Sequence, residues 1–245
     1  MKKAAVWLAL FLLCSGVCTA AQQPVVQVAF LNFSGYAERD ESGRVVGKGV
    51  DLTTRLLHEA GYRAELRILP AARIWLGLES GEVHVWPGML NKPGLAEHTL
   101  QTERDLGRVG INLYHLPGTP PPRWPEDIQG KSLIMITNFT YTTALRQILS
   151  DPARDLTVHK SNSHVGAVQM LLRGRGDYLL DYRTQVSSAL ETLGMQALPS
   201  VGVAELPMRF VLSRQSGFAE RLKTDLDAAF DRLQAQGVEL DVTRQ

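Results

Sequence analysis

Residues 171–181 read Leu-Leu-Arg-Gly-Arg-Gly-Asp-Tyr-Leu-Leu-Asp, and this stretch carries the alternation that decides the fold. It begins at the end of a run whose apolar residues recur at helical spacing, which predicts an amphipathic helix. Gly174 and Gly176 then interrupt that pattern, as turn residues do. The short apolar run at 178–180 predicts a buried strand. A helix that passes through a glycine turn into a buried strand is typical of α/β proteins.

The same alternation runs along the rest of the chain. Short β-branched and aliphatic runs predict strands at residues 25–31, 64–69, 83–86, 109–116, 132–136, 178–180 and 208–212. Apolar stripes between them predict helices around residues 52–60, 74–78, 141–148, 165–172, 186–193 and 218–233. Asp51 stands at the expected start of the first helix, where its carboxylate is expected to cap free amides. This order of elements predicts an α/β fold.

The first twenty residues have the pattern of a secretory signal peptide. Lys2 and Lys3 precede an apolar run at residues 4–17, and small residues follow for cleavage near Ala20. The run is shorter than the roughly 20 apolar residues that a membrane helix needs. Removing 20 of the 245 residues leaves an expected mature protein of 225 residues, soluble in the periplasm.

The composition of the mature part excludes several kinds of site. Both cysteines, Cys14 and Cys18, lie in the leader, each after a bulky residue that argues against lipid attachment. The mature chain therefore has no thiol for a disulfide, a thiolate metal site or a nucleophile. Loss of two lysines lowers the basic residues from 26 to 24, against 25 acidic residues. The basic and acidic residues nearly balance and are spread along the chain, so no basic patch for nucleic acid or an anionic membrane is indicated. A small-molecule partner is expected.

Five blocks of the sequence, in the same order, resemble the extracellular solute-binding proteins of family 3, the polar amino acid type of periplasmic binding protein. They are Gly47-Lys48-Gly49-Val50-Asp51-Leu52; Pro70-Ala71-Ala72-Arg73 with Leu78-Glu79-Ser80-Gly81; Asp127-Ile128-Gln129-Gly130-Lys131 with the strand after it; residues 171–181; and Gln236-Gly237-Val238.

This resemblance implies a two-lobed fold of the type II periplasmic binding protein class, with a ligand cleft between the lobes. By similarity, lobe one is discontinuous and holds residues 21–107 and 206–245, and lobe two holds residues 108–205. The resemblance also implies a monomer that captures a small polar or amphipathic, amino acid-like ligand by lobe closure and delivers it to the permease of an ABC importer. Neither a cofactor nor a metal ion is expected.

The resemblance assigns the ammonium group of such a ligand to Asp181. The family's arginine for the ligand carboxylate is replaced by His98, which offers no guanidinium fork. Arg73 is the candidate substitute because it lies at the mouth of a predicted helix, although pairing with a lobe-one acid is equally open. Arg104 and Arg108 lie downstream and are more simply surface residues.

Further ligand contacts are expected where strands end. Thr137 and Thr140 follow a predicted strand and precede a helix, where they can receive an anion or simply cap the helix. Aromatic residues at or just past a strand end can form the cleft wall, although such residues are often core. The candidates are Phe33, Tyr36, Trp86 and Tyr141.

Two other functions remain open. A periplasmic receptor of the same fold would report ligand to a membrane sensor, and the sequence does not separate it from a carrier. A dehydratase-like enzyme would need a cleft carboxylate as general acid, but Glu38, Glu79 and Glu97 are more simply surface acids. The sequence contains no Gly-x-Ser-x-Gly elbow, His-Glu-x-x-His motif or phosphate-binding loop, so a non-enzymatic role is expected.

Overall fold

The computed structural model describes residues 23–89, 94–137, 139 and 141–243. The expected signal peptide with both cysteines, and the candidate Thr140, lie outside the described residues. Within these ranges, no helix has the length and apolar character needed to cross a membrane.

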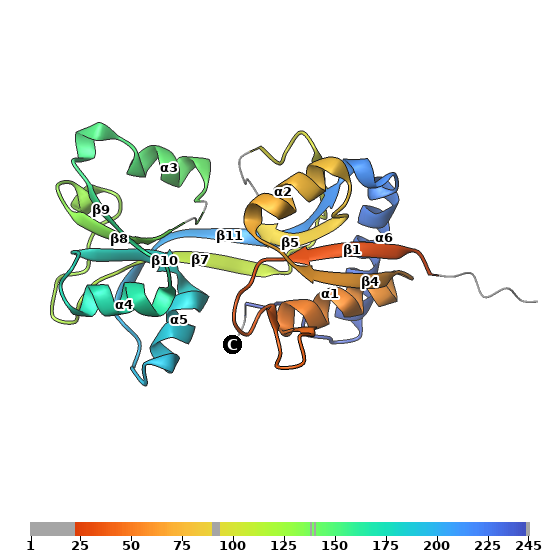
Figure 1. Ribbon diagram of the computed structural model, residues 1–245, viewed down its shortest axis with the longest axis horizontal. Coiled ribbons are helices and arrows are strands. Elements are labelled where there is room, and N and C mark those ends of the chain that lie inside the picture. The colour runs from red at the N-terminus through yellow and green to blue at the C-terminus, as the bar shows by residue number, and fades with distance from the viewer. Residues whose placement is uncertain (1–22, 90–93, 138, 140, 244–245) are drawn as a thin grey trace, which may run out of the picture.

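The first lobe is a short sheet with helices on both faces (Figure 1). Strand β1 (Val25–Phe30) pairs in parallel with β4 (Arg63–Ile68) and β5 (Val85–Met89). Helices α1 (Lys48–Glu59) and α6 (Ala219–Ala235) share one core with β1, and α2 (Ala71–Ser80) packs in a separate core on the opposite face. The C-terminal helix thus belongs to the lobe that the N-terminal part of the chain builds. Three short strands complete this lobe: β2 (Glu38–Arg39), β3 (Val45–Val46) and β6 (Thr99–Gln101).

The second lobe repeats the layered plan with a different set of elements. Strands β8 (Ser132–Ile136), β9 (Thr157–Ser161) and β10 (Tyr178–Tyr182) are parallel, with β8 in the middle. Helix α3 (Thr143–Leu149) covers one face, while α4 (His164–Leu172) and α5 (Arg183–Thr192) cover the other (Figure 1).

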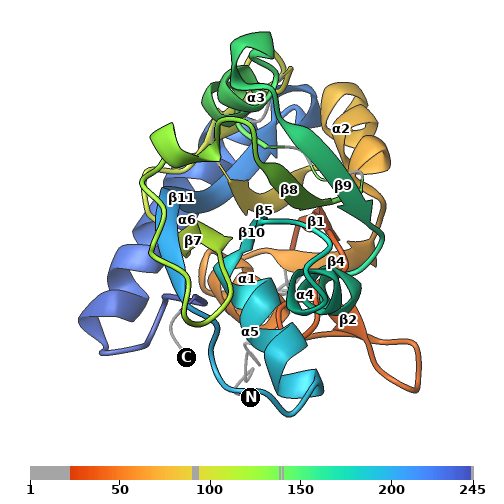
Figure 2. The same ribbon diagram turned by 90° about the vertical axis from the view of Figure 1, so that its left-hand side faces the viewer.

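Two long strands join the lobes. Strands β7 (Gly107–Tyr114) and β11 (Ser200–Ser213) are antiparallel and run from one lobe into the other (Figure 1). Seen along the long axis of the molecule, they lie side by side (Figure 2). They make the sheet continuous in the order β4-β1-β5-β11-β7-β10-β8-β9. The two-lobed α/β fold is therefore confirmed. The lobe boundaries at 107/108 and 205/206 fall in these two strands and remain a prediction.

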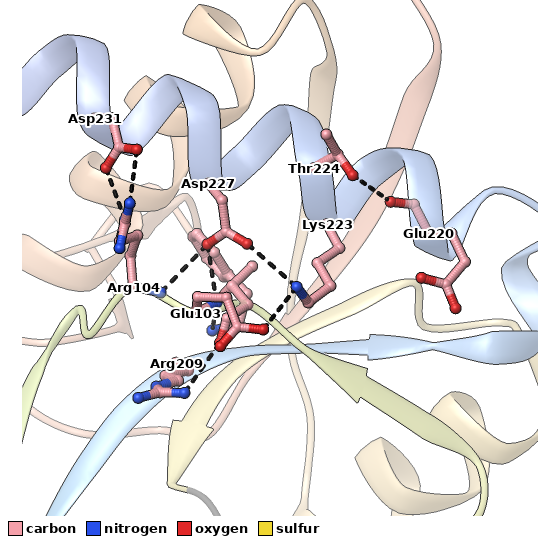
Figure 3. A network of polar contacts seen from close by, with 10 residues as sticks. Glu103, Arg104, Arg209, Glu220, Lys223, Thr224, Asp227 and Asp231 are labelled. Carbon is pink, nitrogen blue, oxygen red and sulfur yellow. Dashed lines mark hydrogen bonds and ion pairs between the residues drawn. The ribbon is translucent and has the colours of Figure 1, made fainter.

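A charged network fastens α6 to the loop between β6 and β7 (Figure 3). The Arg104 guanidinium lies 2.7 and 2.8 Å from the two carboxylate oxygens of Asp231. The Asp227 carboxylate accepts the backbone N–H groups of Glu103 and Arg104, and Lys223 lies 2.8 Å from Glu103. Arg104 thus has a structural partner in the first lobe.

Two local predictions about helix starts are wrong. Helix α1 begins at Lys48 after Gly47, so Asp51 lies within its first turn and does not cap it. Gly47 has a φ of 129° and packs against the Tyr36 carbonyl, a conformation that favours glycine. Tyr141 precedes α3, whose first amides are capped by the Thr142 hydroxyl.

Candidate functional site

A cavity of about 1170 Å³ is lined by residues of both lobes. The first lobe contributes the loop after β1, the start of α2 and the end of β5, while the second lobe contributes residues after β8 and one face of α5. Most of these segments lie at the carboxyl ends of parallel strands, where the side chains of an α/β sheet reach an open edge. This cavity is the candidate binding site.

An aromatic wall dominates the cavity. Three predicted wall residues, Phe33, Tyr36 and Trp86, line it. The Trp86 ring meets Trp75 edge-on, with centroids 4.6 Å apart. Across the cleft, the Phe33 ring lies 5.9 Å from the ring of Phe139 in the second lobe. Three further rings line the cavity and were not predicted from the sequence: Trp75, Phe139 and Tyr182.

Two glycines leave room for this wall. A Cβ on Gly88 would overlap the Trp86 indole, and a Cβ on Gly49 would overlap the Tyr36 ring. Gly49 lies inside α1, where alanine is otherwise preferred by about 1 kcal/mol. Close approach of the tyrosine ring therefore accounts for glycine at this helical position. The burial that results raises the pKa of the Tyr36 phenol, which keeps the hydroxyl neutral.

Polar groups line the second side of the cavity. Helix α5 buries Val186, Ala189 and Leu190 in the core and turns its hydroxyl and amide side chains to the cavity. This polar face was missed because the sequence analysis considered only the apolar stripe of the helix. Thr137, which was predicted, also lines the cavity, and its N–H donates to the Ser161 carbonyl. The α5 residues are Thr184, Gln185, Ser187, Ser188 and Glu191.

Three of the described lining residues are charged: Glu38, Lys48 and Glu191. The Glu38 carboxylate is engaged within its own loop, where it accepts the Gly35 N–H at 3.0 Å and the Ser34 hydroxyl at 3.2 Å. No hydrogen bond or ion pair to the Lys48 ammonium is found within the part of the chain that the structure describes. Among the described lining residues, Lys48 is therefore the free cation.

Asp181 lies behind the cavity wall. Its side chain is fully buried, one carboxylate oxygen accepts the Tyr182 N–H and the other lies 2.7 Å from Nδ1 of His164. Neither Asp181 nor His164 lines the cavity. The residues that line it beside this pair are Phe139 and Tyr182, whose rings lie 5.3 Å apart, and Phe139 also meets the His164 ring edge-on.

Tyr141 is a core residue in the structure. Its hydroxyl donates to the Leu180 carbonyl, and its ring stacks on Tyr182. Burial and the nearby Asp181 charge raise the pKa values of Tyr141 and Tyr182, so both phenols stay neutral. Tyr141 supports the wall from behind instead of lining it.

The arginine and histidine candidates lie away from the cavity. Arg73 is exposed on α2, and Nε2 of His98 lies 3.6 Å from a Glu79 carboxylate oxygen on the surface. Arg108 pairs with Asp105 and Glu205. Among the described lining residues there is no arginine. The described ranges also hold no group of three histidine, cysteine or acidic residues that could bind a metal ion.

Comparisons with known proteins found similarity at the level of structure. No protein-family model and no curated protein sequence matches the chain. An ancestral arginine-binding protein bound to arginine superposes with a TM-score of 0.68 at 18% identity, covering 88% of this chain and 94% of the other. A histidine kinase sensor domain with similarity to periplasmic binding proteins gives 0.69 at 18%, covering 88% and 92%. A putative L-cystine ABC transporter from Listeria monocytogenes gives 0.67 at 18%, covering 87% and 92%.

These neighbours cover nearly the whole of the described chain and share its arrangement of lobes, while their identity is too low to carry function across. The protein has the two-lobed α/β fold of the periplasmic binding proteins.

Proposed function

We propose that this protein is a periplasmic solute-binding protein that captures a small amphipathic ligand between its lobes and delivers it to the permease of an ABC importer. The observation that carries the proposal is the cavity between two lobes that are joined by β7 and β11. A pair of strands can bend, so a ligand that contacts both lobes stabilises their closed arrangement. An arginine-binding protein and a putative L-cystine ABC transporter among the structural neighbours support a role in ligand binding and transport.

The proposed role is non-enzymatic. Of the three acids considered for a dehydratase-like reaction, Glu79 and Glu97 do not line the cavity, and Glu38 is held by its own loop. A general acid needs to reach the reacting group within hydrogen-bond distance, which these positions do not favour. The part of the molecule that faces the cavity is suited to binding.

A thermal-shift screen of the mature protein against amino acids, amines, organic acids and short peptides tests the proposal. A ligand that binds only the folded state at 100 times its Kd stabilises it by about 2.7 kcal/mol. We expect at least one class to raise Tm in a dose-dependent way, without turnover. Ser188→Trp fills the cavity and should abolish the shift, whereas Ser42→Trp in the exposed β2–β3 turn should keep it. A screen without any shift would contradict the binding function.

A sensor role is the second candidate, because one structural neighbour is a histidine kinase sensor domain. Cellular uptake of the identified ligand separates the two. Deletion of the protein should abolish uptake if it serves an importer. Expression of the parent protein should then restore uptake, whereas Ser188→Trp, which fills the cavity, should not. Unchanged uptake together with an altered kinase response would identify a sensor.

A further inference from the structure

The two groups expected to anchor an α-amino acid, the Asp181 carboxylate and an arginine, are both absent from the described cavity lining. Asp181, the residue expected to hold the ammonium, already contacts His164 at 2.7 Å and the Tyr182 N–H at 2.7 Å, and is fully buried. No arginine lines the described part of the cavity to take the carboxylate. The described lining residues therefore favour a different kind of ligand.

An ammonium group would gain little by displacing His164. The imidazole is held at the start of α4, its side chain is only 19% exposed, and the Phe139 ring packs edge-on against it. Displacing the imidazole would leave it without its hydrogen-bond partner inside the protein, and a buried polar group without a partner is costly. A ligand ammonium would also have to pass the rings of Phe139 and Tyr182, which occupy the lining at this place. The His164 imidazole thus occupies the place beside Asp181 that a ligand ammonium would take.

The remaining lining favours a planar apolar body. Aromatic rings of both lobes face the cavity. A ligand ring buried among them would gain binding free energy from the apolar area that it buries and from favourable ring–ring geometry. Both oxygens of Glu38 already accept hydrogen bonds. The other two charged residues of the described lining, Lys48 and Glu191, are both exposed. Lys48 adjoins the aromatic loop, because its backbone N–H donates to the Gly35 carbonyl between Phe33 and Tyr36, whereas Glu191 lies in the last turn of α5 in the other lobe.

We propose that the cavity binds aryl-substituted carboxylates without an α-ammonium group, with the ring between the aromatic residues of the two lobes and the carboxylate at Lys48. This inference rests on the proposed binding function and names the ligand class of the same cavity. Hydroxyl and amide groups of α5 provide additional hydrogen bonds to the polar part of the ligand.

Matched sets of ligands test the proposal on the unmodified mature protein. One set shares a phenyl ring: 3-phenylpropanoate, L-phenylalanine, 2-phenylethylamine and 3-phenylpropan-1-ol. A second set shares an indole ring: indole-3-propanoate, L-tryptophan and tryptamine. Isothermal titration calorimetry gives Kd for each. In at least one set, we expect the carboxylate without an ammonium to bind at least tenfold more tightly than the amino acid, with the amine weakest.

Lys48→Gln tests the place of the carboxylate. It should weaken binding of the preferred aryl carboxylate about tenfold and leave the affinity for the neutral alcohol within twofold. Lys160→Gln is the matched control, because Lys160 is an exposed lysine on β9, outside the cavity lining.

Several results would overturn the inference. Tighter binding of the amino acids or amines than of the carboxylates would show that the site uses an ammonium, and the binding function would stand. Equal loss in Lys48→Gln and Lys160→Gln would remove Lys48 from the site. Absence of binding by both sets, with a shift from another class in the broad screen, would reject the aryl carboxylates alone. If calorimetry detected no binding and the broad screen detected no change in Tm, the binding function would be rejected as well.

Discussion

His84 is a half-buried hydrogen-bonding residue that joins β1 to the start of β5. The His84 Nδ1 accepts the backbone N–H of Gln27 at 3.2 Å, and the backbone N–H of His84 donates to the Gln27 carbonyl. The His84 ring meets Phe218 edge-on. An acceptor Nδ1 requires the neutral imidazole. Burial lowers the pKa of His84 below its ordinary value of 6.5, in agreement with this role.

The lowered pKa predicts the direction of a pH effect on stability. Between the folded pKa and about 6.5, the unfolded chain binds more protons at this residue than the folded chain does. The contribution of His84 is therefore fully present above pH 6.5 and is lost as the pH falls towards the folded pKa. Urea unfolding measured between pH 5 and 7.5 gives the free energy of unfolding as a function of pH. This free energy should rise with pH, and His84→Asn should reduce its slope by at most about 1.4 kcal/mol per pH unit.

The control for this pH experiment is His58→Asn. His58 is exposed at the end of α1, so its removal should leave the slope of the parent protein unchanged. If His84→Asn retained the full slope, the lowered pKa of His84 would not be the source of the effect.

At the scale of elements, the attachment of α6 depends more on one aspartate than on the ion pairs around it (Figure 3). The Asp227 side chain is 17% exposed and accepts two backbone N–H groups of the β6–β7 loop. Asp231 is 49% exposed and pairs with Arg104, which is 48% exposed. Exposed pairs contribute about 0–1 kcal/mol, whereas hydrogen bonds from backbone N–H groups to a mostly buried carboxylate contribute about 1–3 kcal/mol.

Asp227→Ala should therefore lower the free energy of unfolding by about 1–3 kcal/mol, and Asp231→Ala by less than about 1 kcal/mol. Chemical denaturation of both variants at low and high salt measures the difference. Salt should shrink the Asp231 effect, which is Coulombic, more than the Asp227 effect. Equal losses in the two variants would contradict this division.

Helices and strands whose apolar residues form a clear run or recur at regular spacing were predictable from the sequence, and those without such a pattern were not. The predicted strand at 132–136 coincides with β8, and the apolar stripe at 218–233 begins one residue before α6 and ends two residues before its end. Strand β9 was missed because Thr157-Val158-His159-Lys160 is mostly polar, as suits an edge strand that pairs on one side only. For β11, only the core part at 208–212 was predicted, since its first half crosses between the lobes and shows no alternation.

The cavity was predictable only in part, for a similar reason. Phe33, Tyr36 and Trp86 follow from the rule that clefts open at strand ends. The contact between His164 and Asp181 depends on how α4 packs against β10, which no local pattern encodes. Phe139 lay inside a segment considered only for its hydroxyls and amides, and Trp75 was assigned to the apolar stripe of its helix.

At the scale of the whole molecule, ion pairs connect the two joining strands, β7 and β11, to each other and to α5. Arg183, the first residue of α5, lies 3.1 Å from Glu205 on β11 and crosses over Gly110 on β7, where a Cβ would overlap its guanidinium. Glu205 is in turn 3.7 Å from Arg108 on β7. The side chain at the start of the cavity-lining helix therefore rests on both joining strands, which links the position of α5 to their bending.

Across the cavity, the Phe33 and Phe139 rings form a contact between the lobes. An aromatic pair contributes about 0.5–1.5 kcal/mol beyond its buried area, which corresponds to a change of about 2- to 12-fold in an equilibrium constant. Removal of one ring should therefore favour the open arrangement of the lobes. It should also weaken ligand binding, since closure then costs more free energy.

Phe33→Ala is predicted to increase the radius of gyration of the ligand-free protein in small-angle X-ray scattering and to raise the Kd of the best ligand about 2- to 12-fold. Leu76→Ala is the matched control, because Leu76 is a 59% exposed apolar residue of the same lobe outside the cavity lining. The control should change neither quantity. A Phe33→Ala protein with the parent radius of gyration but weaker binding would make Phe33 a ligand contact only. Parent values of both would show that this ring pair does not influence closure, and the joining strands alone would then set the balance between open and closed lobes.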